Sequence, residues 1–387
     1  MKGKELGAVL LVAGCSIGAG MLGVPVITGP CGFLPAVVCF LLAWLFMLTT
    51  GLVLVDLVLH AQKQTAQEVH LITLASRSFG RGGVLLVWFL FSFLFYCVMT
   101  AYMLGGGTLL FDALQGSIPL NMALVLVALF GAIIVLYGAP VLDRLNRFLM
   151  LGLILTYLAL ILTAIPHIDM AYLSRATWAF APLCLPVMII SFGYHNLVPS
   201  LVSYLNKDRK AIRRAIMIGS AIPLIVYIIW EVAILGVIPY SSSQAWEKAV
   251  QSGDMVTRVL AQASGFPWVI RAAEAFAFFA LVTSFLPVAW SFVDFLKDAA
   301  REIGIVKKRT GYLIICVFVP PLIVALTKPH LFLNALSAAG GYAAVTLFGI
   351  LPALMAYKLK LRSRGLMTVL ILFALFVMGV EVYSSLG

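Results

Sequence analysis

Charge is scarce in this sequence. Asp, Glu, Lys and Arg together make up 11% of the 387 residues, whereas 63% are hydrophobic and the mean hydropathy is +1.09. A soluble globular chain carries about 25% charged residues, and no soluble fold of this length could bury so much apolar surface. The apolar runs are long enough to cross a bilayer as helices of roughly 20 residues, and they lack the alternation of a transmembrane β-barrel. The sequence therefore predicts an all-α polytopic membrane protein.

Other absences narrow the function. The six cysteines form no CxxC pair, no HExxH motif occurs and no Asp/His cluster shares a loop, so neither a metal centre nor an enzyme is expected. No cofactor is expected other than a coupling ion. The net charge of +11 lies in short basic clusters between apolar runs, as membrane topology requires, so nucleic-acid binding is not expected. Polar residues occur as local breaks rather than as a stripe through several spans, which disfavours a channel.

The apolar runs predict eleven membrane-spanning helices. They cover residues 6–28, 33–59, 84–111, 119–137, 148–166, 180–203, 212–239, 268–296, 311–327, 331–357 and 366–384. No cleavable signal peptide is expected, because the first apolar run continues through Val26 into the next span. The longest polar loop, 240–267, is predicted to lie outside. No segment resembles a separate soluble domain, so residues 1–387 are predicted to form one transmembrane domain.

The basic residues predict the orientation. With a cytoplasmic N-terminus, 21 of the 26 Lys and Arg residues lie inside. Only five then lie outside: Arg175, Lys248, Arg258, Arg271 and Lys328. This asymmetry follows the positive-inside rule. We therefore expect a multi-pass protein of the bacterial inner membrane, embedded in the lipid bilayer with its N-terminus inside, whose oligomeric state the sequence leaves open.

Two predicted spans contain residues that interrupt a helix. Span one reads Val12-Ala-Gly-Cys-Ser-Ile-Gly-Ala-Gly-Met-Leu-Gly-Val-Pro25, in which each interior glycine costs about 1 kcal/mol of helix stability relative to alanine. Span six reads Pro186-Val-Met-Ile-Ile-Ser-Phe-Gly-Tyr-His-Asn-Leu-Val-Pro199. Spans one and six are five apart, so they correspond in two inverted halves, and paired interruptions of this kind indicate a transporter binding site. The alternative for span one is a face of small residues that lets another helix pack closely.

The interruptions predict how a substrate is held. The second half of span one begins with N–H groups at the positive end of a helix dipole, which suits a carboxylate. These residues are Gly18, Ala19, Gly20 and Met21. In span six, unwound carbonyls around Ser191, Phe192 and Gly193 would accept hydrogen bonds from an ammonium group. A site for an anion that faces a site for a cation fits a zwitterionic amino acid.

These two motifs resemble those of the bacterial aromatic amino acid permeases, especially the tyrosine-specific transporters. The matching residues are Leu6-Gly-x4-Val12-Ala-Gly-x2-Ile-Gly-Ala-Gly-Met-Leu-x2-Pro25 and Ser191-Phe-Gly-Tyr-His-x3-Pro-Ser-Leu-Val-Ser-Tyr204. The resemblance implies the amino acid–polyamine–cation superfamily and a leucine-transporter-type fold with a 5+5 inverted repeat and broken helices 1 and 6. The repeats would cover about 6–166 and 180–357, with an extra helix at 366–384.

The resemblance also implies an activity, namely secondary active symport. The protein would import an aromatic amino acid, most of all tyrosine, by alternating access driven by a proton or sodium gradient. The alternative is the same fold carrying a different amino acid, an amine or a nucleobase.

The coupling ion stays open between sodium and a proton. In sodium-coupled members of this fold, a carbonyl and two hydroxyls of span eight complete a sodium site with carbonyls of broken helix one. The matching residues are Gly14, Ile17, Ala280, Thr283 and Ser284. The two hydroxyls could instead bond to carbonyls of their own helix. The family is usually described as proton-coupled, and Glu231 and His195 are the midspan groups most able to carry a proton.

Aromatic side chains are the candidates for contact with the substrate ring. We consider Tyr96 and Tyr102 on span three, Phe192 and Tyr194 on span six, and Phe279 on span eight. Because 12% of the chain is aromatic, packing against lipid or neighbouring helices is the alternative for each of them. His195 or Asn196 could hydrogen-bond a phenolic hydroxyl, and a site that does so discriminates strongly against substrates that lack it.

Overall fold

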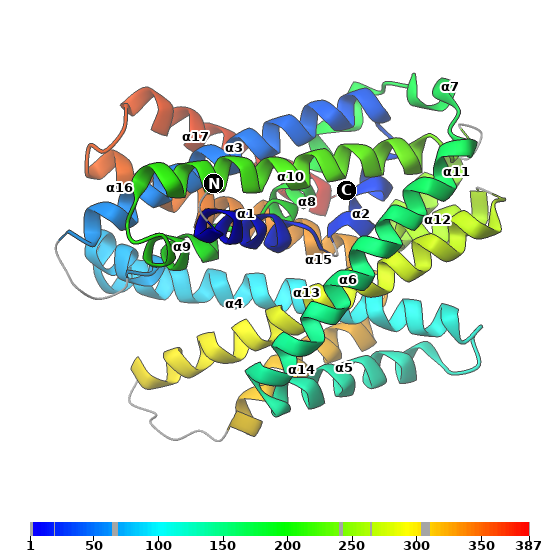
Figure 1. Cartoon of the computed structure of the whole chain (residues 1–387), viewed down its shortest axis with the longest axis horizontal. Coiled ribbons are helices and arrows are strands. Elements are labelled where there is room, and N and C mark those ends of the chain that lie inside the picture. The colour runs from blue at the N-terminus through cyan, green and yellow to red at the C-terminus, as the bar shows by residue number, and fades with distance from the viewer. Residues whose placement is uncertain are drawn as a thin grey trace.

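A computed structural model of the chain describes residues 3–18, 20–63, 69–239, 243–263, 265–302 and 310–386. Within these ranges the chain is mostly helical and contains no β-strand. Most long helices run along the longest axis of the molecule and lie side by side as a bundle (Figure 1). The predicted all-α fold is confirmed.

The first half of the chain forms six helices. They are α1 (Gly3–Ser16), α2 (Gly20–Thr28), α3 (Phe33–Ala61), α4 (Leu71–Ala113), α5 (Leu120–Tyr137) and α6 (Ala139–Ala164). The connection to the second half contains three short helical segments, η1 (Ile165–His167), α7 (Met170–Leu173) and η2 (Trp178–Cys184).

The second half begins with another interrupted span. This span consists of α8 (Leu185–Ser191), the turn η3 (His195–Leu197) and α9 (Val198–Tyr204). The helices that follow are α10 (Arg209–Leu235), α11 (Ser243–Ser252), α12 (Val256–Ala263), α13 (Pro267–Glu302) and α14 (Thr310–Thr327). The last elements are α15 (Phe332–Ala338), the π-helix η5 (Ala339–Ile350), α16 (Leu351–Lys358) and α17 (Arg364–Leu386).

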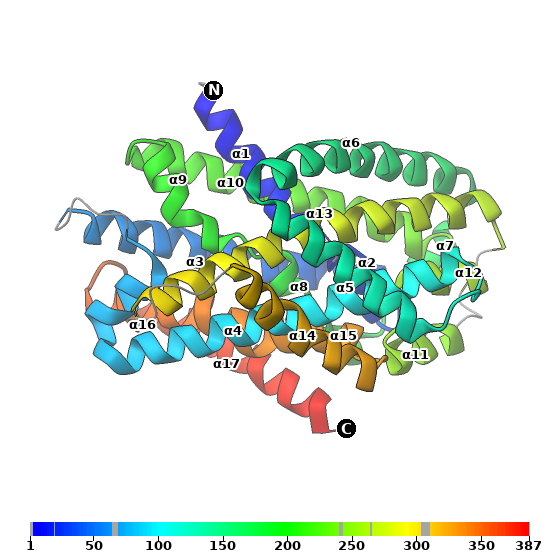
Figure 2. The ribbon, with the colours of Figure 1, turned by 90° about the horizontal axis from the view of Figure 1, so that it is seen from below.

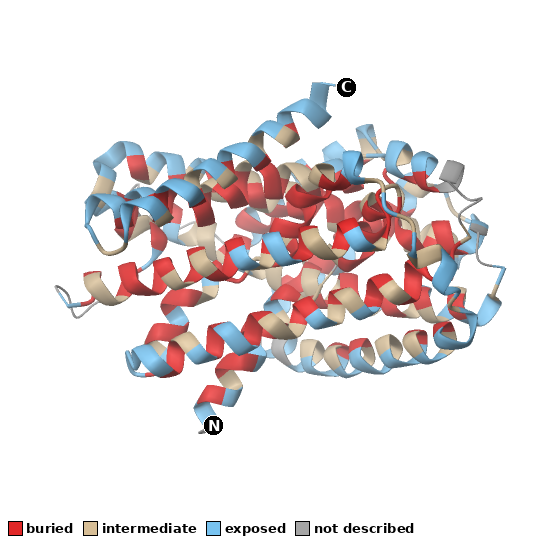
Figure 3. Ribbon diagram, turned by 90° about the horizontal axis from the view of Figure 1, so that it is seen from above, coloured by how far each residue is buried: buried red, intermediate tan, exposed pale blue. Residues whose placement is uncertain are grey.

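The helices are long and apolar enough for a membrane protein. Among the described residues, nine helical stretches could cross a bilayer, and the bent pair α1–α2 makes a tenth. The remaining predicted span, 311–327, is an apolar helix that is shorter than these. The count of eleven spans therefore stays a prediction. Large apolar side chains are exposed on the outer helices, as lipid contact requires; Phe148 and Leu162 on α6, for example, are 69% and 68% exposed. Buried residues gather in the middle of the bundle and exposed residues around it (Figure 3).

Two segments that the sequence predicted as loops are partly helical. Helix α4 begins at Leu71, inside the predicted loop, and is interrupted at Gly80, whose φ of 63° is one that few residues other than glycine adopt. The predicted outer loop 240–267 contains α11 and α12, which pack against each other and against α2. Trp246 of α11 lies directly on Gly29, at the end of α2.

The interrupted spans form the centre of the bundle. Helices α3 and α10 pack against each other, and α10 also packs along α1. Helix α8 contacts α2, α3 and the π-helix η5. Helices α4, α6 and α13 enclose the other side, with α6 and α13 lying side by side in both views (Figures 1 and 2). The centre is therefore surrounded by continuous helices that can hold an irregular backbone away from lipid.

Ion pairs join helix ends on the side predicted to face the cytoplasm. Asp56 at the end of α3 is buried and accepts hydrogen bonds from Arg209, at 2.7 Å, and from Arg362, at 2.7 Å. Glu5 of α1 accepts from Arg214 of α10 at 2.6 Å. These contacts connect α1, α3, α10 and the segment before α17.

Candidate functional site

Span one is interrupted where its glycines predicted. Helix α1 ends at Ser16, α2 begins at Gly20, and the two helices are bent by 55° relative to each other. The Met21 amide donates to the Gly18 carbonyl at 3.0 Å, so the first turn of α2 is tight. The first amides of a helix lack partners within it and lie at the positive end of its dipole, as an anion site requires. Ala19, which the sequence placed in the site, lies outside the described residues.

Span six is interrupted at its predicted position as well. Helix α8 ends at Ser191, and the backbone continues as a turn before α9 begins at Val198. The Phe192 amide donates to the Met188 carbonyl at 3.2 Å, and the Gly193 amide donates to the Ile190 carbonyl at 3.0 Å. Helix α9 begins a new series of backbone hydrogen bonds, so the carbonyl groups of the turn do not belong to a continuous helix.

The two interruptions touch each other. A Cβ atom on Gly20 would lie 2.4 Å from Ser191 Oγ, which is closer than a nonbonded carbon and oxygen approach each other. The Cys15 thiol donates to the Gly193 carbonyl at 3.4 Å. Backbone groups from the start of α2 and from the end of α8 are therefore within reach of one small ligand, and any side chain at position 20 crowds Ser191.

One face of α10 holds both halves of the broken span one. The Tyr227 hydroxyl donates to the Ser16 carbonyl at 3.0 Å, at the end of α1. The Trp230 indole donates to the Met21 carbonyl at 2.8 Å, at the start of α2. The Thr28 hydroxyl, at the end of α2, donates to Glu231 Oε2 at 2.9 Å. Residues 227, 230 and 231 share one helical face, so this face fixes the position of the interruption.

We expect Trp230→Phe to lower uptake about tenfold without loss of folded protein. The substitution keeps the aromatic packing but leaves the buried Met21 carbonyl without its 2.8 Å donor, which costs about 1–3 kcal/mol. Trp44→Phe is the matched control, because the Trp44 indole donates to Ser220 at 3.1 Å between α3 and α10, away from the interruption. Equal transport rates in both variants and the unmodified protein would show that the bond does not position the site.

The residues predicted for a sodium ion lie on segments that meet. A Cβ atom on Gly18 would lie 2.3 Å from Ser284 Oγ, so the end of broken span one contacts the middle of α13. The Thr283 hydroxyl donates to the Phe279 carbonyl at 2.7 Å, as the self-bonding alternative expected. A hydroxyl that donates in this way keeps its oxygen lone pairs for a cation. Ion binding by Gly14, Ile17, Ala280, Thr283 and Ser284 stays a prediction.

Both proton candidates are buried and only partly hydrogen-bonded. Glu231 is 0% exposed, and its Oε1 atom has no hydrogen-bond partner among the described residues. His195 Nε2 lies 2.9 Å from Thr50 Oγ1, and its Nδ1 atom has no such partner either. The imidazole is stacked between Tyr194 and Phe348, with ring centroids 4.9 Å from each. Each group therefore has one atom at which a proton could be gained without breaking an existing bond.

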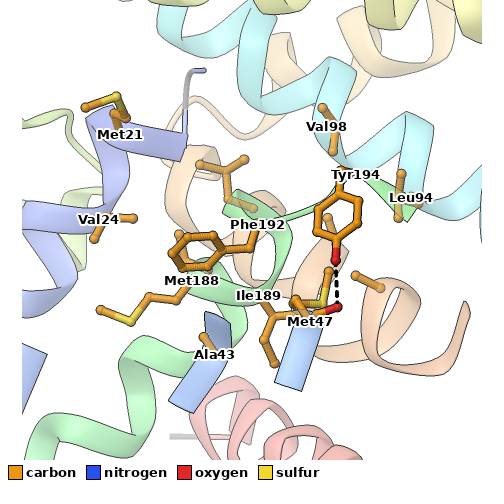
Figure 4. Packing of buried hydrophobic residues seen from close by; sticks show 14 of the residues in the cluster. Met21, Val24, Ala43, Met47, Leu94, Val98, Met188, Ile189, Phe192 and Tyr194 are labelled. Carbon is orange, nitrogen blue, oxygen red and sulfur yellow. Dashed lines mark hydrogen bonds between the residues drawn. The ribbon is translucent and has the colours of Figure 1, made fainter. Parts of the chain in front are cut away.

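The aromatic candidates point in different directions. Phe192 is buried against Phe40 and Tyr227, on the side of α3 and α10. Tyr194 donates a hydrogen bond to the Met47 carbonyl at 3.1 Å, also on α3 (Figure 4). Tyr96 donates to the Cys316 carbonyl on α14, and Phe279 lies against Gly152 on α6. Tyr102 lies beside Ser284, the residue of α13 that meets span one at Gly18.

Several residues around the interruptions were not predicted from the sequence. Tyr227 and Trp230 share a helical face with Glu231, so their spacing in the sequence indicates that they lie beside this carboxyl group. Cys15 was treated only as a small hydrophobic residue, although its thiol contacts span six. Glu381 on α17 was also missed; it is buried and accepts a short hydrogen bond from Ser337. A carboxyl group inside a predicted span is a sequence signal in its own right.

The chain is similar to transport proteins over nearly its whole length. It matches the tryptophan/tyrosine permease family over residues 1–381. It is 29% identical over 371 residues to tyrosine-specific transport system 2 of Haemophilus influenzae, which covers 94% of this chain and 90% of that protein. It is also 28% identical over 348 residues to glutamine transporter 2 of Aliivibrio fischeri, which covers 88% of this chain and 85% of that protein.

A solved structure is similar in fold. The crystal structure of a manganese transporter from Eremococcus coleocola matches with a TM-score of 0.67, over 98% of this chain and 85% of that chain, at 15% sequence identity. At this identity the likeness shows the fold alone, and it confirms the predicted leucine-transporter-type fold. The chain therefore belongs to the tryptophan/tyrosine permease family and is a membrane transporter rather than an enzyme.

Proposed function

We propose that this protein imports tyrosine across the bacterial inner membrane as a secondary active symporter that works by alternating access. The observation that carries the proposal is the contact between Gly20 at the start of α2 and Ser191 at the end of α8. It places the positive end of one half-helix beside the negative end of another. These ends suit the carboxylate and the ammonium of a free amino acid.

The similarity to a tyrosine-specific transport system supports tyrosine as the substrate. Tyr102 lies beside Ser284, which meets the broken span one at Gly18, and a phenol ring could stack on it. The second candidate function is transport of another amino acid on the same fold, which the similarity to a glutamine transporter favours. A tenfold excess of unlabelled glutamine should leave the uptake of labelled tyrosine unchanged if tyrosine is the substrate; strong inhibition by glutamine favours the second candidate.

We propose that a proton drives the transport and that Glu231 carries it. A buried carboxylate without a neighbouring positive charge is costly, so a bound proton stabilises this position. Sodium is the alternative, and it would bind where Gly18, in the interruption of span one, meets Ser284 of α13. A Cβ atom added at Gly18 would lie 2.3 Å from Ser284 Oγ. Either ion would bind next to a half of the broken span, where it could couple to the movement of the substrate site.

Proteoliposomes with a proton gradient or a sodium gradient imposed separately test the proposal. We expect the proton gradient alone to drive tyrosine accumulation in the unmodified protein. Glu231→Gln should abolish this accumulation but keep the exchange of internal for external tyrosine, because glutamine mimics the protonated carboxyl group. Thr283→Ala combined with Ser284→Ala is the matched variant for the sodium site. Accumulation that needs sodium and disappears in the double variant would contradict proton coupling, and a failure of any gradient to accumulate tyrosine would contradict the substrate.

A further inference from the structure

A large cavity lies beside the substrate site rather than in it. It has a volume of about 1130 Å³ and is enclosed by α4, α5, α12 and α13 with one residue of α11. Small-molecule sites usually measure about 300–1,000 Å³, so the cavity can hold an amino acid. By the predicted orientation its polar end, next to α11 and α12, lies on the outer side. Its inner end includes Tyr102, whose side chain lies beside that of Ser284 and so stands between the cavity and the broken span one.

The polar residues of the cavity lie at one end and the apolar residues at the other. Arg258 at the polar end is fully engaged: it pairs with both oxygens of Asp112 at 2.9 Å and with Asp254 at 2.8 Å. These two carboxylates raise the pKa of Arg258 through their hydrogen bonds, so this group of three is a fixed part of the wall. The apolar end is formed by residues such as Val127, Leu281 and Phe285.

Besides this group of three, Lys248 of α11 and two charges of opposite sign on α13 line the cavity. Arg271 and Glu274 lie one turn apart on α13 and both line the cavity. Neither forms an ion pair with a described residue; the Arg271 guanidinium instead lies 5.8 Å from the centre of the Trp268 ring. A free amino acid has a carboxylate and an ammonium separated by one carbon, and these two side chains could bind both at once.

A third polar group points to a ligand independently. Thr257 of α12 lines the cavity and is only 3% exposed, yet its hydroxyl oxygen has no hydrogen-bond partner among the described residues. Buried hydroxyl groups are normally hydrogen-bonded, and an unpaired one is costly. A rotation of the Thr257 side chain toward the cavity would let an amino acid held by Arg271 and Glu274 supply the missing partner.

We propose that this cavity is an outer binding site for the transported amino acid, occupied before the substrate passes Tyr102. Arg271 binds the carboxylate, Glu274 binds the ammonium, and the side chain of the substrate extends toward Leu281 and Phe285. Thr257 adds a hydrogen bond to the backbone of the substrate. The proposal rests on the proposed amino acid transport but concerns a second place of binding.

Equilibrium binding of radiolabelled L-tyrosine to the purified full chain, together with uptake into proteoliposomes, tests the proposal. We expect two tyrosine molecules per unmodified chain and one in Arg271→Gln and in Glu274→Gln. Each variant should also raise the tyrosine concentration for half-maximal uptake about tenfold, as loss of one charge-assisted hydrogen bond predicts, with the maximal rate unchanged. Lys328→Gln, on the same predicted side but outside the cavity, is the control and should match the unmodified protein.

Thr257→Val separates a role in binding from a role in folding. Because the hydroxyl bonds to no described residue, we expect unchanged or higher thermal stability but weaker outer binding. One tyrosine per unmodified chain, or two in both charge variants, would overturn the proposal. A phospholipid that co-purifies with the protein and is lost in Arg271→Gln, while tyrosine binding is unchanged, would also overturn it and assign the cavity to lipid. In each of these cases, normal tyrosine uptake by the unmodified protein would leave the proposed function unaffected. If the unmodified protein takes up no tyrosine, the proposed function itself is contradicted.

Discussion

Replacing Gly20 with leucine is expected to abolish tyrosine uptake while the chain still inserts and folds. Any side chain at position 20 begins 2.4 Å from Ser191 Oγ and 3.1 Å from Ser191 Cβ. The Ser191 hydroxyl could rotate away from a single methyl group, so Gly20→Ala should keep a fraction of the activity. Leucine must push the start of α2 away from the end of α8, which separates the two half-helix ends that hold the substrate backbone.

A second substitution makes this test specific. Gly20→Ala combined with Ser191→Gly removes both close contacts and should recover much of the uptake that Gly20→Ala alone loses. Gly379→Leu is the control, because no atom lies within 4 Å of a Cβ at that position on α17. Initial rates of labelled tyrosine uptake, normalised to protein in the membrane, are the measurement. Uptake by Gly20→Leu above half of the unmodified rate would mean that the two interruptions do not form the site.

Replacing Gly340 with alanine should destabilise the whole protein, because the added methyl group has no room. A Cβ atom at this position would lie 1.8 Å from the Pro186 carbonyl oxygen and 2.7 Å from its carbon. Both are backbone atoms, so no rotation of a side chain relieves the overlap. The π-helix η5 would have to move away from α8. Overpacking of a core typically costs about 1–3 kcal/mol and occasionally more.

Thermal unfolding of purified variants would measure this effect. We expect Gly340→Ala to lower the unfolding temperature clearly and to reduce the yield of monodisperse protein. Gly341→Ala tests the neighbouring face of the π-helix: its new Cβ would lie 2.6 Å from Glu381 Cβ, an atom fixed by the α17 backbone, so this variant should also lose stability. Gly379→Ala should have no effect. Equal stability of all three variants would show that the π-helix does not pack directly on span six.

The interruptions were predictable from the sequence because their causes are local. Glycine and proline destabilise a helix wherever they occur, and lipid does not tolerate an irregular backbone that is unprotected. The clustering around Gly20 and around Gly193 was therefore enough to locate both breaks.

The directions of the aromatic side chains were not predictable. Phe192 and Tyr194 lie on span six within three residues of Ser191, but their rings extend to α3 and α10 because of packing in three dimensions. The sequence shows which residues are near the break, and it does not show which face of the turn meets which helix. The π-helix was likewise not visible, because hydrogen bonds to the fifth residue depend on the tertiary contacts around it.

The two helices of the outer loop, α11 and α12, have a hydrophobic periodicity that is visible in the sequence. In the segment 243–263 the buried residues recur every three or four positions, as in Trp246 and Ala249 and in Val256, Val259 and Leu260. That spacing indicates amphipathic helices. The abundance of Ser, Gln and Gly suggested a loop, and the periodicity would have corrected it.

The face of α10 that carries Tyr227, Trp230 and Glu231 has a mechanical consequence. It is bonded to the last carbonyl of α1, to the first turn of α2 and to the end of α2. Helix α10 therefore fixes the bend at the glycines, and the two halves of span one cannot move independently while these bonds persist. We expect span one and α10 to move as one unit, so that access changes by movement of this unit against α3 and α8, on which it packs, rather than by bending at the glycines.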